Sequence, residues 1–259
     1  MRKKLQSITK TKLPAIITLA CLCIVWQMLC SLNIVPSFML PSPVNVGRAF
    51  VSEFPLLMKN AGITLTEAMV GLSMGIVIGF VFAVLMDRFN MLYRAFYPVL
   101  ILTQTIPTVA IAPLLVLWFG YEMTPKIILI VLTSFFPIAV GLLDGFKSVD
   151  VDELNLLRSM GASHLQMFRY IKFPAALPQF FSALRISVTY AVVGAVISEW
   201  LGGFGGLGVY MTRVKKAFAF DKMFAVIFLI STLSLLLMLL VNVIAKRCMP
   251  YLENEKLIN

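Results

Sequence analysis

The chain has 259 residues, of which 60% are hydrophobic and only 13% are charged, whereas soluble domains average roughly 25% charged residues. This composition excludes an ordinary soluble domain and predicts an integral membrane protein. The net charge is +10, but nothing else in the sequence supports nucleic-acid binding, so we attribute the excess of basic residues to membrane topology.

Six apolar segments are long enough to cross a hydrocarbon core about 30 Å thick, and they predict an all-α fold. They cover about Leu13–Leu32, Ala61–Met86, Tyr93–Phe119, Ile127–Leu143, Ala175–Leu201 and Phe224–Ala245. Arg2, Lys3 and Lys4 precede the first segment, as basic residues do in a secretory signal peptide. Because the segment is long and no convincing small-residue cleavage site follows it, we expect a retained span.

The basic residues also predict the orientation of the spans, because they concentrate in cytoplasmic loops. With the N-terminus inside, the inner segments carry twice as many Lys and Arg residues as the outer ones. Both termini and a polar loop at residues 147–178 are then cytoplasmic. A basic cluster from Arg213 to Lys222 falls on the outer side, where we expect a solvated surface.

The second span carries small residues at every fourth position, namely Gly71, Gly75, Gly79 and Ala83. Such a stripe lets another helix backbone approach closely, which matters in lipid because the hydrophobic drive between helices is missing. The stripe predicts a seam within the subunit or, as the second choice, a seam between two subunits. Glu67 precedes it by one turn and is expected to extend toward the membrane rim.

The third span contains Pro98, Pro107 and Pro113. Each proline inside a helix removes a hydrogen bond, so we expect this span to be kinked or broken. Broken spans occur where the backbone lines a cavity, because the freed carbonyls need partners. Gln104 and Pro107 are therefore candidates for the lining of a translocation route.

The segment from Asp150 to Pro178 is a long polar island in an otherwise apolar chain. Two capping-box patterns, Asp150-x-x-Glu153 and Ser163-x-x-Gln166, each predict the start of a short helix. Gly161 lies between them, where a helix end favours a residue that is free to take positive φ. Pro174 and Pro178 are expected to close the second helix and begin the next element. Two short helices that meet at a glycine suit docking to another protein better than they suit chemistry.

Polar residues of the fifth span share one helix face, because their spacing alternates between three and four. The face consists of Ser182, Arg185, Thr189, Val192, Val196 and Glu199. Charges inside a bilayer normally face protein or water, so Arg185, Thr189 and Glu199 are candidates for the translocation route. An equally good alternative is that Arg185 and Glu199 extend to the inner and outer membrane surfaces.

Several motifs of soluble enzymes are excluded. Gly203 to Gly208 fits the G-x-G-x-x-G expression, but it follows a membrane helix rather than a strand, so we expect a flexible loop. No phosphate-binding G-x-x-x-x-G-K-[ST] sequence occurs. His164 and the four cysteines, Cys21, Cys23, Cys30 and Cys248, have no metal-ligand spacing. The chain is therefore expected to bind no metal or cofactor and to be no enzyme.

The spacing of Gly161, Ile171, Pro174, Leu177 and Pro178 resembles the EAA loop of binding-protein-dependent ABC transporter permeases. At the positions of the family's Glu-Ala-Ala, this chain has Asn155, Leu156 and Leu157. In that family the loop is a cytoplasmic coupling helix that fits a groove on an ATPase subunit. The resemblance assigns coupling to Glu153, Leu157, Gly161, Ala162, Pro174 and Pro178.

The resemblance further implies a single transmembrane domain over residues 1–259 in the cytoplasmic membrane. Its partners would be ATPase subunits that hold ATP, an extracytoplasmic substrate-binding protein, and a second permease subunit, expected to be another copy of this chain. The run LPSP at Leu40–Pro43 and the run EWLGGFGGLG at Glu199–Gly208 are similar to the nitrate, sulfonate, taurine and thiamine-precursor branch. We therefore expect a small polar substrate such as a thiamine pyrimidine precursor, another heterocycle, a sulfonate or nitrate.

The alternative from a different class is an ATP-independent secondary transporter or a channel. Internal repeats would favour that alternative, and the sequence shows none. Copurification of an ATPase and a requirement for ATP hydrolysis in uptake distinguish the two classes.

Overall fold

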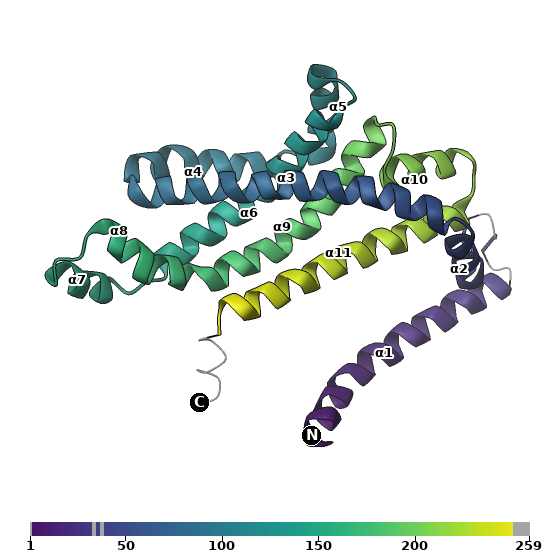
Figure 1. The fold of residues 1–259 in the computed structure, drawn as a ribbon. Helices are drawn as coiled ribbons and strands as arrows, with labels where there is room; N and C mark the ends of the chain where they lie inside the picture. The colour runs from purple at the N-terminus through teal and green to yellow at the C-terminus, as the bar shows by residue number, and fades with distance from the viewer. Residues whose placement is uncertain (1, 33–34, 37–38, 251–259) are drawn as a thin grey trace. The chain divides into compact units, whose positions relative to one another are not determined.

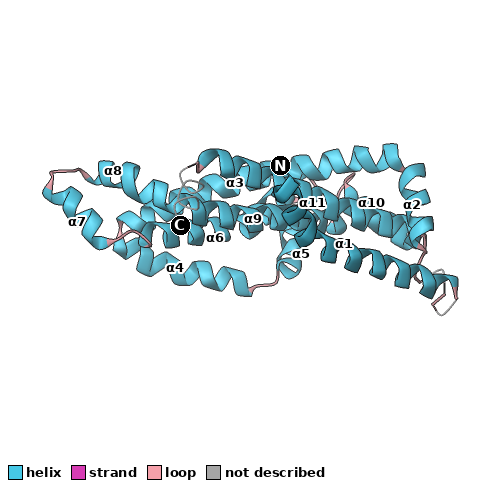
Figure 2. Ribbon diagram, turned by 90° about the horizontal axis from the view of Figure 1, so that it is seen from below, coloured by secondary structure: helices cyan, strands magenta, loops and turns pink. Residues whose placement is uncertain are grey.

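A computed structural model describes residues 2–32, 35–36 and 39–250, and every regular element within these ranges is a helix (Figure 2). The helices that form or flank the spans are α1 (Arg2–Ser31), α2 (Pro43–Ser52), α3 (Phe54–Arg88), α4 (Asn90–Thr105), α5 (Thr108–Phe119) and α6 (Met123–Lys147). They are followed by α7 (Val151–Ser159), α8 (His164–Met167), the π-helix η1 (Phe168–Lys172), α9 (Phe173–Leu201), α10 (Leu207–Lys216) and α11 (Phe220–Cys248). The predicted all-α fold is confirmed.

In the described residues four helices are long and apolar enough to cross a membrane, or five if α4 and α5 together form one span. These correspond to the second to sixth predicted spans. Some side chains of the first predicted span lie outside the described ones, and its described apolar part is Ile17–Ser31 of α1.

The third predicted span is broken, as its prolines indicated. Helices α4 and α5 meet at an angle of 98°. Ile106 and Pro107 have extended backbone at the break, and Pro107 is the N-cap residue of α5. Pro98 and Pro113 lie inside helices, so Pro107 alone coincides with the break.

The chain forms two compact parts, one of residues 59–209 with 230–259 and one of residues 1–58 with 210–229. In the larger part, α6 and α9 lie side by side (Figure 1). A Cβ atom on Gly141 would lie 2.6 Å from the Ala183 side chain, and one on Gly145 would lie 2.6 Å from Ala176 Cα. Close backbone approach at small residues therefore holds these two helices together.

The glycine stripe of α3 packs against α6. A Cβ atom on Gly75 would overlap the Ser134 hydroxyl, and one on Gly79 would lie 2.9 Å from the Phe135 carbonyl oxygen. Gly71 meets Ile130 in the same way, at 2.5 Å. The prediction of a seam within the subunit is confirmed.

The smaller part is joined by aromatic and polar contacts. Trp26 of α1 lies against Phe224 and Phe228 of α11, with ring centroids 5.8 and 5.9 Å apart. Lys222 forms an ion pair with Glu53. These contacts join segments that are far apart in the sequence.

The α3–α6 seam generates a stability prediction. Replacing Gly75 by leucine should push α3 away from α6 and destabilise the folded chain by about 1–3 kcal/mol, the usual range for overpacking. We expect less monodisperse protein after detergent extraction and a lower unfolding temperature.

The matched control is Gly62→Leu, because Gly62 lies on the same helix and a Cβ atom there meets nothing within 4 Å. This control should behave like the unmodified chain. Equal yields and unfolding temperatures for the two variants would show that the seam contributes nothing.

Candidate functional site

The polar loop between α6 and α9 begins with two capped helices. The Asp150 carboxylate accepts a hydrogen bond from the Asp152 N–H at 2.9 Å, so it caps α7 through that residue and not through Glu153 as predicted. At α8 the predicted capping box is complete. The Gln166 N–H donates to the Ser163 hydroxyl at 3.3 Å, and the Ser163 N–H donates to Gln166 Oε1 at 2.7 Å. Both helix starts are therefore set by local sequence.

Gly161 ends α7 in a left-handed conformation, with φ of +83°. The Gly161 N–H donates to the Arg158 carbonyl at 3.0 Å, and the Ala162 N–H donates to the Leu157 carbonyl at 2.9 Å. This pair of bonds is the Schellman motif, which satisfies the last carbonyls of a helix and favours glycine. The predicted turn between two short helices is confirmed.

The loop exposes apolar side chains that a polar loop would not need. Leu156, Met160 and Tyr170 are 63%, 74% and 68% exposed. A hollow of about 260 Å³ lies among Leu157, Met160, Gly161, Ala162, Gln166 and Tyr170. Three of the residues predicted to couple to the ATPase, Leu157, Gly161 and Ala162, thus lie together, whereas Glu153 is exposed in the first turn of α7.

The prediction that Pro174 and Pro178 close the second helix is wrong. Residues His164–Leu201 form one continuous helix of 38 residues. The π-helix η1 makes this continuity possible, because the Phe173 N–H donates to the Phe168 carbonyl five residues back, just before Pro174. The wider turn accommodates a residue that lacks an N–H. Pro174 is in the first turn of α9, and Pro178 lies within that helix.

An ion pair attaches the end of the loop to α3. Lys172, the last residue of η1, donates to both carboxylate oxygens of Asp87 at 2.8 and 2.9 Å. Both side chains are largely buried, at 23% and 16% exposed. Sequence reasoning missed this pair, although Asp87 is the only carboxylate near the inner end of the second predicted span. Helix continuity and this ion pair together connect the loop to two spanning helices.

The predicted polar face of the fifth span is divided by the packing. Arg185 and Thr189 are partly exposed and Ser182 is exposed, whereas Val192, Val196 and Glu199 are buried. The structure therefore contradicts the extension of Glu199 to the outer surface, and it separates the buried Glu199 from the partly exposed Arg185 on the predicted face. Gln104 and Pro107 are exposed on either side of the α4–α5 break.

Glu199 instead forms the centre of a buried hydrogen-bond network. The residue is 1% exposed. The Thr64 hydroxyl donates to Oε1 at 2.7 Å, and the Gly208 N–H donates to Oε2 at 2.6 Å. The carboxyl group thus links α3, α9 and the start of α10, with its polar atoms satisfied as a buried group requires.

The same network fixes the glycine-rich segment that was predicted to be a flexible loop. The Gly206 N–H donates to Asn60 Oδ1 at 3.0 Å, and the Leu207 N–H donates to the Thr64 hydroxyl oxygen at 2.9 Å. Gly206 has φ of +117°, and a Cβ atom there would overlap the Glu199 carboxyl group. The prediction of a flexible loop is wrong. These glycines allow the backbone to lie close to Glu199 and Asn60, and its hydrogen bonds fix its conformation.

Glu67 lies inside the protein rather than at the membrane rim, and it is 4% exposed. Its Oε1 atom accepts a hydrogen bond from Lys126 Nζ at 2.6 Å, and Lys126 is itself 5% exposed. The prediction that Glu67 extends to the rim is therefore wrong. A signal for these residues was present, because Asn60, Thr64 and Glu67 lie on one helix face that continues into Gly71.

No group of three or more His, Cys, Asp or Glu side chains within the described ranges is placed to hold a metal ion. The capped loop and the helices that support it make up the candidate site.

Residues 75–249, more than half of the chain, match the family described as "Binding-protein-dependent transport system inner membrane component". The chain belongs to this family. The match includes the whole capped loop, α9 and the glycine-rich segment.

Similar proteins agree with this assignment. The chain is 37% identical to a "Probable ABC transporter permease protein" of Haemophilus influenzae over 83% of this chain and 88% of that protein. It is 40% identical to the "Formylaminopyrimidine transport permease protein ThiX" of Halalkalibacterium halodurans over 77% and 80%. A chain of the inward-facing MetNI methionine ABC transporter shares the fold, with a TM-score of 0.67 at 21% identity over 76% of this chain and 98% of that chain.

The chain is therefore the membrane permease subunit of an ABC importer for a small solute. This assignment overturns the alternative of an ATP-independent transporter or channel. A permease of this family works with an ATPase and with a substrate-binding protein.

The Glu199 network generates a second prediction. Glu199→Ala would remove the Glu199 acceptor of the Gly208 N–H and one of the two acceptors of the Thr64 hydroxyl, which also reaches the Asn60 carbonyl oxygen at 3.2 Å. This loss should lower stability by about 1–3 kcal/mol. The measurement is the unfolding temperature of the purified chain in detergent, which should fall.

Glu122→Ala is the matched control, since Glu122 is an exposed carboxylate at the start of α6 that makes no cap hydrogen bond. It should unfold at the temperature of the unmodified chain. A Glu199→Ala variant as stable as this control would contradict the structural role of the network.

Proposed function

We propose that this permease imports a small heterocyclic solute of the thiamine pyrimidine precursor class across the cytoplasmic membrane, with both termini in the cytoplasm. The observation that carries the proposal is the 40% identity to a formylaminopyrimidine permease over 80% of that protein. Relatives named for riboflavin and taurine transport are 29% identical. The similarity thus favours the pyrimidine over the sulfonate, and nitrate permeases are no more similar, at 28% identity.

We propose that ATP is bound and hydrolysed by a separate subunit that docks on the loop at residues 147–178. Two features of the loop support this. Its backbone is fixed by a capping box and a Schellman motif, so it presents a defined shape. Its exposed Leu156, Met160 and Tyr170 offer apolar surface to a partner, as the centres of protein interfaces do.

We propose that the second permease subunit is another copy of this chain, packed on the open side of α6 and α9. A groove of about 460 Å³ lies there, with Phe136, Val140 and Ile186 among its lining residues. Tyr190 and Val193 continue the exposed face of α9. The route would then follow Ser182, Arg185 and Thr189 at this face. A purified transporter containing one copy of the chain would contradict this assembly.

The function is tested in proteoliposomes that contain the permease, its ATPase and its binding protein. Labelled formylaminopyrimidine should accumulate only when ATP is hydrolysed, and unlabelled taurine or nitrate should not compete. Uptake without ATP would contradict the coupling, and competition by taurine or nitrate alone would reassign the substrate class.

The coupling role of Gly161 is tested in the same assay. Valine is β-branched and tolerates positive φ poorly, so Gly161→Val should disrupt the turn between α7 and α8. We expect uptake to fall about tenfold, equivalent to about 1.4 kcal/mol, while membrane insertion persists.

The control is Gly161→Asn, since asparagine tolerates the left-handed region and a Cβ atom at this position meets nothing within 4 Å. Asparagine should retain most of the uptake. If valine and asparagine were equally harmless, the turn would have no part in coupling. If both abolished uptake, the ATPase would need the bare backbone rather than the turn geometry.

A further inference from the structure

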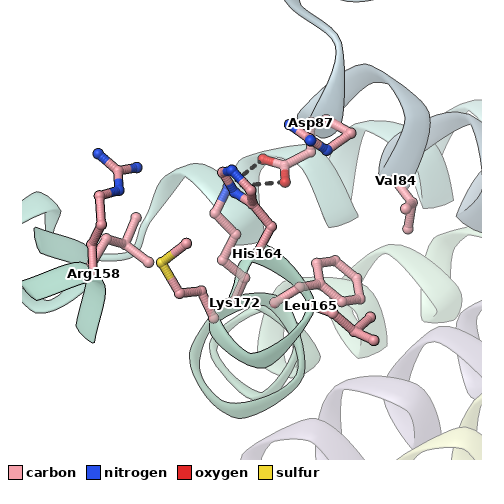
Figure 3. Close-up of a pocket in the computed structure, with 10 residues that line it drawn as sticks. Val84, Asp87, Arg158, His164, Leu165 and Lys172 are labelled. Carbon is pink, nitrogen blue, oxygen red and sulfur yellow. Dashed lines mark hydrogen bonds and ion pairs between the residues drawn. The ribbon is translucent and has the colours of Figure 1, made fainter. Parts of the chain in front are cut away.

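A second cavity, of about 490 Å³, lies between the end of α3 and the inner side of the loop. Figure 3 shows its two sides. Val84 and Asp87 come from α3, and Arg158, His164 and Lys172 come from α7, α8 and η1. This cavity is separate from the apolar hollow at Gly161, and it shares only the Lys172–Asp87 ion pair with the connection between the loop and α3.

The cavity has an excess of positive charge. Arg88, Arg158 and Lys172 line it, opposed by one carboxylate, that of Asp87. Lys172 and Asp87 neutralise each other in their ion pair. Arg88 and Arg158 form no salt bridge with any residue in the described ranges. Two guanidinium groups therefore remain available to an anion.

The walls between these charges are apolar. Leu165 and Phe168 from the loop and Val84 from α3 line the cavity together. Leu165 is 75% exposed, so its side chain is accessible to the apolar part of a ligand. A matching ligand would combine an anionic group with an apolar body.

The position of the cavity along the helices identifies where such a ligand would come from. Arg88 is the last residue of the spanning helix α3, and His164 is the first residue of the 38-residue helix that contains α9. The cavity therefore lies beside the ends of two helices that are long and apolar enough to cross a membrane, within reach of the lipid headgroups. Basic pockets between helices at this level bind anionic phospholipids, and paired guanidinium groups suit the oxygens of a phosphate.

We propose that this cavity binds the phosphate ester of an anionic phospholipid, with Arg88 and Arg158 holding the phosphate and Val84, Leu165 and Phe168 covering the apolar part. The shared chemistry is a phosphate group on an apolar body. Free phosphate compounds are the other source of that group, and the experiment separates the two sources.

The experiment measures lipid binding to the full-length purified chain by native mass spectrometry in mixed micelles of phosphatidylglycerol or phosphatidylcholine. The test variant is Arg88→Gln with Arg158→Gln. The control variant is Arg94→Gln with Arg169→Gln, which removes two exposed arginines outside the cavity and so changes the net charge equally. Phosphatidylglycerol binding should weaken about tenfold in the test variant, or about 1.4 kcal/mol, and should stay unchanged in the control.

A second arm adds millimolar inorganic phosphate to the unmodified chain. If phosphatidylglycerol stays bound, the lipid is the ligand. If inorganic phosphate displaces it, the cavity binds free phosphate compounds instead, which contradicts the lipid assignment. If the glutamine variant does not fold, Arg88→Lys with Arg158→Lys keeps the charge but loses the paired donors, and should weaken binding to an intermediate degree.

Four results would overturn the proposal. Equal losses in the test and control variants would mean that surface charge alone attracts the lipid. Unchanged binding in the test variant, or equal binding of phosphatidylcholine, would remove the anion site. Loss of ATPase copurification with unchanged lipid binding would assign the two arginines to the protein partner. None of these measurements requires transport, so the lipid proposal is tested independently of the proposed substrate.

Discussion

Close contact between helix backbones is the constraint on which this subunit depends. In lipid an apolar side chain gains little by leaving the solvent, so helices associate through packing and hydrogen bonds. Helix α6 meets α3 at Gly71, Gly75 and Gly79, and it meets α9 through its own Gly141 and Gly145. The Ser187 hydroxyl adds a hydrogen bond from α9 to the Ser134 carbonyl at 2.8 Å. The three helices therefore form one block whose spacing is set by glycines.

Buried polar groups fix the other end of the block. Glu199 accepts hydrogen bonds from Thr64 and Gly208, and Glu67 pairs with Lys126. An unsatisfied polar group is costly in the membrane, so these contacts allow few alternative arrangements of α3, α6 and α9. The glycine-rich segment after α9 is fixed by the same groups and is part of the block.

The sequence predicted what depends on local pattern. The long apolar helices, the break at Pro107, the caps at Asp150 and Ser163 and the turn at Gly161 follow from residues within a few positions of one another. Glu199 and Glu67 were misplaced because their partners, Thr64 and Lys126, are distant in the sequence. Pro174 and Pro178 were predicted to close a helix, but the helix continues through both. The π-helix η1 accommodates Pro174, and no residue pattern indicated a π-helix there. The sequence held one signal for the buried network: Asn60, Thr64 and Glu67 share a helix face that continues into the glycine stripe at Gly71.

Because α8, η1 and α9 are continuous and Lys172 is paired with Asp87, we expect the loop to move together with the membrane helices. The most direct measurement of this coupled motion is ATP-driven uptake by charge-reversed variants of the pair. Asp87→Lys and Lys172→Asp should each uncouple ATP hydrolysis from uptake, because like charges would then repel across the joint. The double exchange restores opposite charges and should restore coupling. Full uptake in either single variant, or no recovery in the double variant, would contradict the claim.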